Sequence, residues 1–283
     1  MDIALYRQFY ADEVAAVCCL ASSYLIEALA RIERERFLPA GPWLVRGEAD
    51  AMARTTPDAD PRHVYHNYSI AIDAGRHLFN GAPGAVARLV DALGIGAGGR
   101  VLHIGAGLGY YTAVMAHMVG ATGRVVAYEA DAQLAEGARR NFVRFEAVDV
   151  CCGPATSVAG FDGVDAVLVS AGVTHPLECW LDAVRPGGRL AIPLTVAIPA
   201  MGPLGKGITV LLTKKDSRTF DARAMGMTAI YSAVDIRDAA ANEAIGRAMQ
   251  RLPFPRLGSF TTAPHECSSR CWLHTDRFCL SEQ

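Results

Sequence analysis

The feature that most constrains this fold is an alternation of apolar and amphipathic segments that begins at residue 100. The apolar segment Arg100–Ile104 leads into the glycines of residues 105–109, and a helical pattern follows. Strands are expected at residues 100–104, 124–128, 147–151, 166–170, 189–193 and 209–213, and helices at 110–119, 132–141 and 176–184. Strands connected by such helices pair in parallel through right-handed crossovers. We therefore predict an α/β fold with a doubly wound, mostly parallel sheet that binds ligands at the carboxyl ends of its strands.

The segments on either side of this alternation are less regular. A helix is expected over residues 12–36, with Asp12 as its N-cap and the prolines after Phe37 as its end. A polar stretch at 47–60 predicts a surface loop, residues 65–73 predict a short strand, and Pro83 opens a helix. Residues 239–251 form a last helical pattern, and a tail rich in Ser, Thr, Cys and His follows it.

Composition argues against two classes of partner. Of the 283 residues 51% are hydrophobic and the net charge is −2, which offers little attraction for nucleic acid phosphates. The longest apolar stretch, residues 14–26, is shorter than the roughly 20 residues of a membrane span, and acidic residues precede it where a signal peptide would be basic. The eight cysteines fit reduced thiols. We therefore expect a cytoplasmic protein that binds neither nucleic acid nor membrane, and its N-terminal helix could pair two subunits in a homodimer.

A glycine-rich turn and an acidic residue carry the first functional signal. Gly105, Gly107 and Gly109 follow a predicted strand, and glycine lets a ligand approach the backbone closely. Their two-two spacing differs from the two-three spacing of the dinucleotide fingerprint. Glu129 lies at the tip of the next predicted strand, where a carboxylate can accept both hydroxyls of a ribose. The pair predicts a site for a nucleoside that lacks a pyrophosphate.

Three stretches of the chain resemble the protein-L-isoaspartate O-methyltransferase family. They are Ile26-Glu27-Ala28-Leu29 leading to Arg34-Glu35-Arg36-Phe37-Leu38-Pro39, then residues 100–114, and finally residues 165–172 with 186–194. Together they cover roughly residues 26–195. The resemblance implies a class I methyltransferase fold, S-adenosylmethionine as cofactor, and methyl transfer to a carboxylate.

The resemblance also implies cofactor positions, which fall here on Gly105, Gly107, Gly109 and Glu129. Adjacent residues expected to contact the cofactor are His103, Ala106, Tyr110, Ala130, Cys152, Gly153 and Ser170. On this reading the chain has three parts: an N-terminal helical extension with an acceptor-side loop (1–84), a cofactor-binding core (85–215), and a C-terminal helix with a Cys/His-containing arm (216–283).

The chain departs from the family pattern at three positions. The family's serine in the loop before the predicted Pro83 helix is replaced by Gly81. The acid usual two places before the first glycine is His103. The glycine-aspartate pair expected after the third strand appears as Cys151-Cys152-Gly153, with Asp149 close by in sequence. These departures affect the methyl acceptor and the adenine side more than the ribose side.

The predicted function is O-methyl transfer to a carboxylate of a peptide, a protein or a small molecule. A carboxylate is already anionic, so proximity and desolvation can drive its methylation without a base. His77, Asn80 and His175 are the candidate residues for contact with the acceptor. Two alternatives stay open: a catalytically silent module that keeps the cofactor fold, and an NAD-dependent oxidoreductase, which the glycine spacing disfavours.

The C-terminal tail contains potential metal ligands in an unusual order. Cys267, Cys271, His274 and Cys279 could supply four zinc ligands, with His265 nearby, but their spacing matches no standard zinc finger. Apolar residues such as Trp272 and Phe278 lie between them. We therefore predict an arm that packs on the core and binds no metal.

Overall fold

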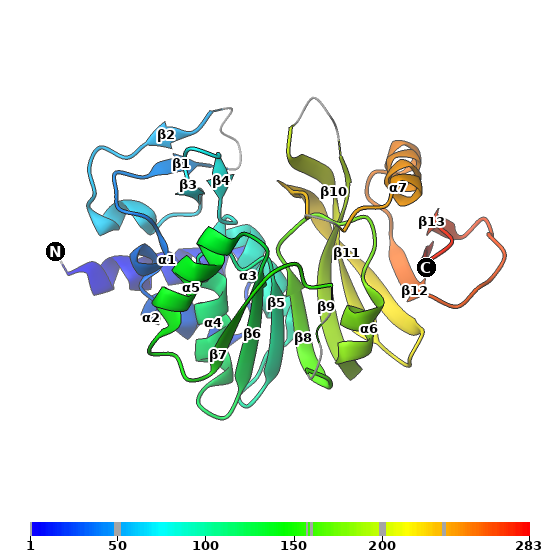
Figure 1. Cartoon of the computed structure of the whole chain (residues 1–283), viewed down its shortest axis with the longest axis horizontal. Coiled ribbons are helices and arrows are strands. Elements are labelled where there is room, and N and C mark those ends of the chain that lie inside the picture. The colour runs from blue at the N-terminus through cyan, green and yellow to red at the C-terminus, as the bar shows by residue number, and fades with distance from the viewer. Residues whose placement is uncertain (1, 48–51, 157, 159–160, 198–201, 234–235) are drawn as a thin grey trace. The chain divides into compact units, whose positions relative to one another are not determined.

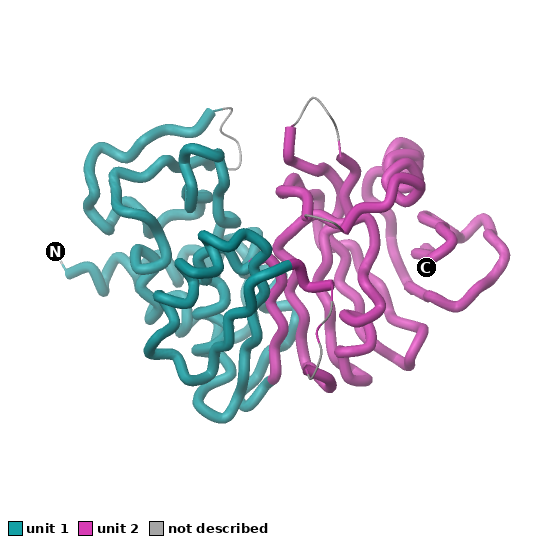
Figure 2. Tube along the Cα trace, in the orientation of Figure 1, with its two compact units in different colours: residues 1–99, 106–153 teal, residues 100–105, 154–283 magenta. Residues whose placement is uncertain are grey.

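The structure is a computed structural model that describes residues 2–47, 52–156, 158, 161–197, 202–233 and 236–283. It contains two compact units (Figure 2): unit 1 comprises residues 1–99 and 106–153, and unit 2 comprises residues 100–105 and 154–283. The predicted division of the chain into three functional parts, with boundaries at residues 84 and 215, differs from these units and stays a prediction. None of the described helices is long and apolar enough to cross a membrane.

Unit 1 begins with two helices where the sequence predicted one. Helix α1 spans Ile3–Cys18 with Asp2 as its N-cap, and α2 spans Ser23–Arg31 with Ser22 as its N-cap. The predicted helix over residues 12–36 was therefore wrong at both ends. It breaks at Cys19, which adopts a left-handed conformation with φ of 52° and ends α1. The hydroxyl of Ser22 then accepts the backbone N–H of Leu25 and starts the next helix.

A small antiparallel sheet follows α2 in unit 1 (Figure 1). Its strands are β1 Leu44–Arg46, β2 Arg54–Thr55, β3 Ser69–Asp73 and β4 Leu78–Phe79, in the order β2-β1-β3-β4. The 3₁₀ turns η1 Arg34–Phe37 and η2 Pro61–Val64 flank them. The predicted loop over residues 47–60 therefore contains β2, and its residues 48–51 lie outside the described part. Only the second half of the strand predicted over residues 65–73 is a strand, and it forms β3.

Buried Arg34 holds these N-terminal elements together. Its guanidinium is 0% exposed and donates to the backbone carbonyls of Val64, His66 and Tyr68 at 2.7, 3.0 and 2.9 Å. It also lies over the rings of Tyr10 and Tyr110. A buried charge with this many partners fixes the loop that leads into β3.

The rest of unit 1 confirms the predicted alternation. Its elements are α3 Pro83–Leu93, α4 Tyr110–Val119, β6 Arg124–Glu129, α5 Ala132–Phe142 and β7 Val148–Cys152. Strands β6 and β7 pair in parallel, and Glu129 is opposite Cys152. Helix α4 spans the predicted residues 110–119 with Gly120 as its C-cap, and Pro83 is the first residue of α3, also as predicted.

Unit 2 contains the rest of the parallel strands and a large antiparallel extension. The elements are β5 Arg100–Ile104, β8 Val164–Val169, α6 Glu178–Ala183, β9 Val184–Ala197, β10 Leu204–Lys214 and β11 Thr219–Tyr231. Strand β8 pairs in parallel with β5 and with β9, which confirms the α/β class. The expectation that residues 209–213 continue the parallel series was wrong, because β10 is antiparallel to β9 and β11. No described helix links β9 to β10, so no crossover forces parallel pairing.

The chain ends in a segment we call the C-terminal arm, residues 257–283. After α7 Ala239–Arg251 it forms β12 Leu257–Thr261, β13 Cys271–His274 and β14 Cys279–Glu282, where the sequence suggested a tail. Strand β12 pairs with β11 and β14, and β13 pairs with β14, all antiparallel. Its apolar side chains Phe260, Trp272, Phe278 and Leu280 are at most 3% exposed. The predicted packing of this arm through its apolar residues is confirmed.

Candidate functional site

The glycine turn, residues 105–109, connects β5 to α4 and requires left-handed backbone. Gly107 has a φ of 57° and Gly109 a φ of 97°, a backbone region that residues other than glycine rarely adopt. A Cβ on Gly109 would lie 2.4 Å from the ring of Phe142. Phe142 packs in turn on Phe37 of η1, with ring centroids 5.7 Å apart. The turn is therefore shaped by its own backbone and by aromatic packing behind it.

Glu129 is bound to this turn at the end of β6. Its carboxylate accepts the N–H of Gly107 at 2.7 Å and the N–H of Asp131 at 2.9 Å. The residue is 8% exposed, and burial raises the pKa of its carboxyl group above the ordinary value. A carboxylate offers about four lone pairs, so acceptor capacity beyond these two bonds remains for a ligand. This geometry suits a ribose that presents two hydroxyls to one carboxylate.

The segment between β3 and Gly81 covers the same part of unit 1. A Cβ on Gly107 would lie 3.0 Å from Cδ1 of Ile72 in β3, so Ile72 sits over the turn. Arg76 pairs with Asp73 at 2.6 Å and with Asp131, the N-cap of α5. The hydroxyl of Tyr111 donates to the carbonyl of Gly81. The acceptor-side loop is thus tied to α4 and to the residues after Glu129.

Sequence reasoning missed Arg76 and Asp131, which make this tether. Asp131 could have been found, because an aspartate directly before the predicted helix at 132–141 is a typical N-cap. It accepts the N–H groups of Gln133 and Leu134 at 3.0 and 2.9 Å. Arg76 had no local signal, since its second partner lies 55 residues further along the chain.

Of the three acceptor candidates, Asn80 and His77 lie in this loop. The side-chain oxygen of Asn80 accepts the N–H of Ile70 at 2.8 Å, while its buried Nδ2 has no hydrogen-bond partner among the described residues. A buried donor of this kind is costly unless a ligand or water meets it. His77 is exposed and has a φ of 53°. Asn80 is therefore the better placed of the two to bind an acceptor oxygen.

The predicted residues of unit 2 form two separate groups. His103 is 1% exposed and contacts the hydroxyl of Ser170 through Nε2 at 3.0 Å, and burial lowers its pKa to about 3. Gly105 approaches the same serine, since a Cβ there would lie 3.3 Å from the Ser170 carbonyl. His175 instead contacts the Thr174 hydroxyl through Nδ1 at 3.0 Å. Burial lowers the pKa of His175, which favours its neutral form.

The remaining predicted contacts are weaker. The side chain of Tyr110 is 3% exposed and lies against Tyr10 and Arg34, so only its backbone could meet a cofactor. Ala106 is buried, whereas Ala130, directly after β6, and Cys152, the last residue of β7, are exposed. The N–H of Gly153 donates to the carbonyl of Glu129 at 2.8 Å. Asp149, close by in sequence, pairs with Arg124 at 2.6 Å.

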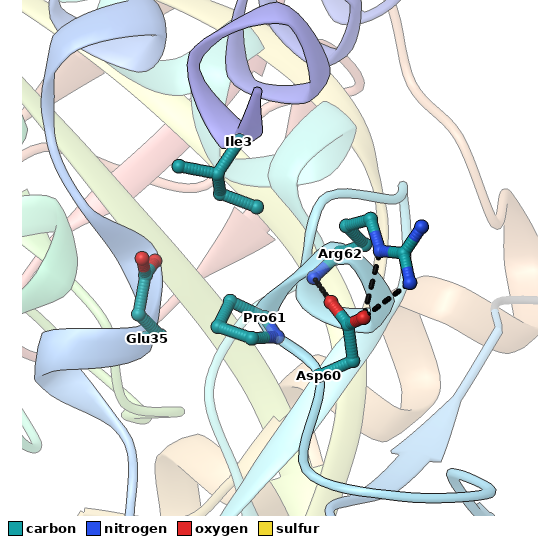
Figure 3. A pocket seen from close by; sticks show the side chains of 5 residues that line it. All are labelled: Ile3, Glu35, Asp60, Pro61 and Arg62. Carbon is teal, nitrogen blue, oxygen red and sulfur yellow. Dashed lines mark hydrogen bonds and ion pairs between the residues drawn. The ribbon is translucent and has the colours of Figure 1, made fainter. Parts of the chain in front are cut away.

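A hollow of about 330 Å³ in unit 1 involves none of the predicted site residues (Figure 3). It is lined by Ile3, Glu35, Asp60, Pro61 and Arg62. Its charged groups are already paired, because Asp60 accepts from the backbone and the guanidinium of Arg62, and Glu35 accepts from Tyr65. With its polar groups satisfied by one another, it has little left with which to bind a ligand.

Comparison with known proteins gives a consistent result. Residues 50–201 match the family model described as protein-L-isoaspartate(D-aspartate) O-methyltransferase. A protein-L-isoaspartate O-methyltransferase of Methanothrix thermoacetophila is 31% identical over 212 residues, which cover 73% of this chain and 86% of that protein.

Two solved structures share the fold at low sequence identity. A protein-L-isoaspartate O-methyltransferase superposes with a TM-score of 0.60 at 20% identity, covering 98% of this chain and 88% of that one. A Plasmodium falciparum protein in complex with S-adenosyl-L-homocysteine superposes with a TM-score of 0.61 at 15% identity, covering 81% of this chain and 98% of that one.

Proposed function

Because this chain belongs to the protein-L-isoaspartate O-methyltransferase family, a family of S-adenosylmethionine-dependent methyltransferases, we propose that it methylates a carboxylate on a peptide, a protein or a small molecule. The observation that carries the proposal is the carboxylate of Glu129. It is held by the N–H of Gly107 at 2.7 Å, and its remaining acceptor capacity would serve the ribose of the cofactor. The S-adenosyl-L-homocysteine complex of the Plasmodium relative supports the same cofactor class.

The residues present fit this cofactor. When bound, S-adenosylmethionine supplies a methyl group on a positively charged sulfur. Glu129 would accept the ribose hydroxyls, and the glycine turn would let the adenosyl group approach the backbone. Burial lowers the pKa of His103 to about 3, so its imidazole is neutral at physiological pH.

We place the acceptor beside the loop that ends at Gly81. Asn80 would donate through Nδ2 to a carboxylate oxygen, and Arg76 and Tyr111 would hold the loop in position. A carboxylate acceptor is already anionic, so orientation and desolvation rather than a base would drive the transfer. His77 and His175 stay secondary candidates for acceptor contact.

The test is methyl transfer to a set of matched peptides. We would measure S-adenosylhomocysteine release with one peptide in three versions that carry isoaspartate, aspartate or asparagine at one position, with every other carboxyl group blocked. We expect release with at least one of the two acids, none with the amide, and a base-labile methyl ester as product. Release with the amide would contradict carboxylate methylation.

One outcome would favour the silent-module alternative. If the protein binds S-adenosylmethionine in the same buffer but releases no product with either acid or with a panel of small carboxylates, catalysis is absent. An Asn80→Asp variant serves as a second probe, because it removes the Nδ2 donor while keeping the contact to Ile70. We expect it to lower turnover with an acid and to leave cofactor affinity unchanged.

A further inference from the structure

The C-terminal arm gathers four side chains that could hold a metal ion. The ligand atoms of His265, Cys271, His274 and Cys279 all lie within 4.8 Å of one another. A tetrahedral zinc with Zn–S of about 2.3 Å and Zn–N of about 2.0–2.1 Å separates its ligand atoms by roughly 3.3–3.8 Å. The cluster therefore needs only a small contraction to surround one ion. We infer that these four residues bind a structural zinc ion, where the sequence led us to predict none.

The hairpin geometry explains why a non-standard spacing works. His274 and Cys279 are directly paired between β13 and β14, so their side chains share one face. Residues three apart in a regular strand point to opposite faces, which would separate Cys271 from His274. The register shifts between Cys271 and Leu273, however, and this irregularity returns both ligands to the same face.

The fourth ligand comes from the loop between β12 and β13. The Nδ1–H of His265 donates to the carbonyl of Ala263 at 3.0 Å, and its Nε2 lies 3.9 Å from the sulfur of Cys271. A metal-bound histidine commonly donates its second ring N–H to a carbonyl in this way, which fixes the tautomer. The rings of His265 and His274 stand edge to face with centroids 4.9 Å apart.

Two further observations point to a bound metal ion at this cluster. The Nδ1 of His274 is buried and has no hydrogen-bond partner among the described residues. The backbone N–H of Ser268 donates to the sulfur of Cys271 at 3.3 Å, an arrangement that stabilises a thiolate bound to a metal. A zinc ion would satisfy the first group and be supported by the second.

The donor set selects the ion and its role. Two thiolates and two imidazoles favour zinc over hard cations such as Mg²⁺. Four protein ligands close the coordination sphere, which is typical of a structural site. On binding, the two cysteine thiols release their protons to solvent, and no group is oxidised or reduced. The ion would fix the loop at residues 262–270 to the β13–β14 hairpin.

The first experiment measures metal content in the full-length protein. Protein purified with reductant and without chelator should contain about one zinc per chain. Replacement by Co²⁺ should produce visible ligand-field bands and thiolate-to-metal charge-transfer bands, and Mg²⁺ should produce neither. Folded protein that takes up no zinc from zinc-containing buffer, or that carries a Cys271–Cys279 disulfide in fresh reduced preparations, would overturn the inference.

Variants then test the ligand set. His265→Ala should weaken Co²⁺ affinity by roughly 100-fold while the chain stays folded, because His265 is exposed and supplies one of four bonds. Cys279→Ser should reduce the intensity of the charge-transfer bands to about half, because the Cys271 thiolate remains as a ligand. Cys267→Ser and Cys19→Ser alter exposed cysteines outside the cluster and should leave affinity unchanged. A loss in Cys267→Ser equal to that in His265→Ala would contradict the assigned set.

Discussion

The glycine turn and the C-terminal arm are held in shape by different interactions. The turn is made by backbone conformation, with Gly109 at a φ of 97° and Glu129 held by two backbone N–H groups. The arm is made by side chains, with Trp272 at 1% exposure and four metal-ligand atoms gathered around an irregular hairpin. We therefore expect an added side-chain atom to destabilise the turn, and a truncated side chain to destabilise the arm.

The largest effect is expected from emptying the arm's core. Trp272→Ala removes a buried indole whose Nε1 donates to the carbonyl of Leu252 at 2.9 Å. Such truncations cost about 3–5 kcal/mol of unfolding free energy. Phe254→Ala is the matched control, because Phe254 is 49% exposed, and it should cost less than about 1 kcal/mol in the same urea titration. Equal costs would mean that side-chain burial does not hold the arm.

The turn should respond instead to a single added methyl group. Gly109→Ala places a Cβ 2.4 Å from Phe142 on backbone that alanine disfavours, and we expect a loss of about 2–4 kcal/mol in thermal or urea unfolding. Gly94→Ala at the C-cap of α3 changes an exposed glycine that is also left-handed, with φ of 66° and ψ of 38°. This control should lose about 1 kcal/mol, and a similar loss in both variants would remove the role assigned to Phe142.

A pH effect should follow from His103, in the strand that precedes the turn. Burial lowers its pKa in the folded protein to about 3, whereas it titrates near 6.5 when unfolded. The stability that it contributes is complete above about pH 6.5 and falls as the pH drops toward 3, by roughly 1.4 kcal/mol per pH unit. We expect about 2 kcal/mol to be lost between pH 7 and pH 5.

The control for this prediction is His103→Gln, which keeps a partner for Ser170 but cannot titrate. The variant should show a smaller loss of unfolding free energy over the same pH interval. An unchanged slope would assign the acid sensitivity to other groups and leave His103 with no part in it.

A smaller effect is expected where the loop departs from the family pattern. Gly81→Ser restores the missing hydroxyl, but its Cβ would lie 2.4 Å from a methyl group of Val86. We expect the single variant to lose about 1–2 kcal/mol and the double variant Gly81→Ser/Val86→Ala to recover part of that loss. No recovery would show that the strain lies elsewhere.

The same contrast explains what could be predicted from the sequence. The turn and Glu129 lie in strand order, so local patterns were enough to find them and the α/β core. The helix break at Cys19 was not predicted, because its left-handed conformation is not marked in the sequence by a glycine. The antiparallel pairing of β10 and β11 was not predicted, because this β-hairpin extension begins where the strand–helix alternation stops.

Long-range polar contacts were the other class that the sequence did not reveal. Arg34 binds carbonyls more than 29 residues away in sequence, and Arg76 reaches Asp131. The metal ligands of the arm were noticed as residue types, but their grouping depends on a register shift at Trp272 that no spacing rule shows.

The central claim is that Glu129 and the glycine turn bind the adenosyl group, and calorimetry with S-adenosylhomocysteine tests it directly. Wild-type protein should bind, and Glu129→Gln should weaken binding by about 10–100-fold, which corresponds to about 1.4–2.8 kcal/mol. Glu136→Gln changes an exposed glutamate on α5 and should bind as the wild type does. No heat with the wild type, or equal affinity in Glu129→Gln and Glu136→Gln, would contradict the account.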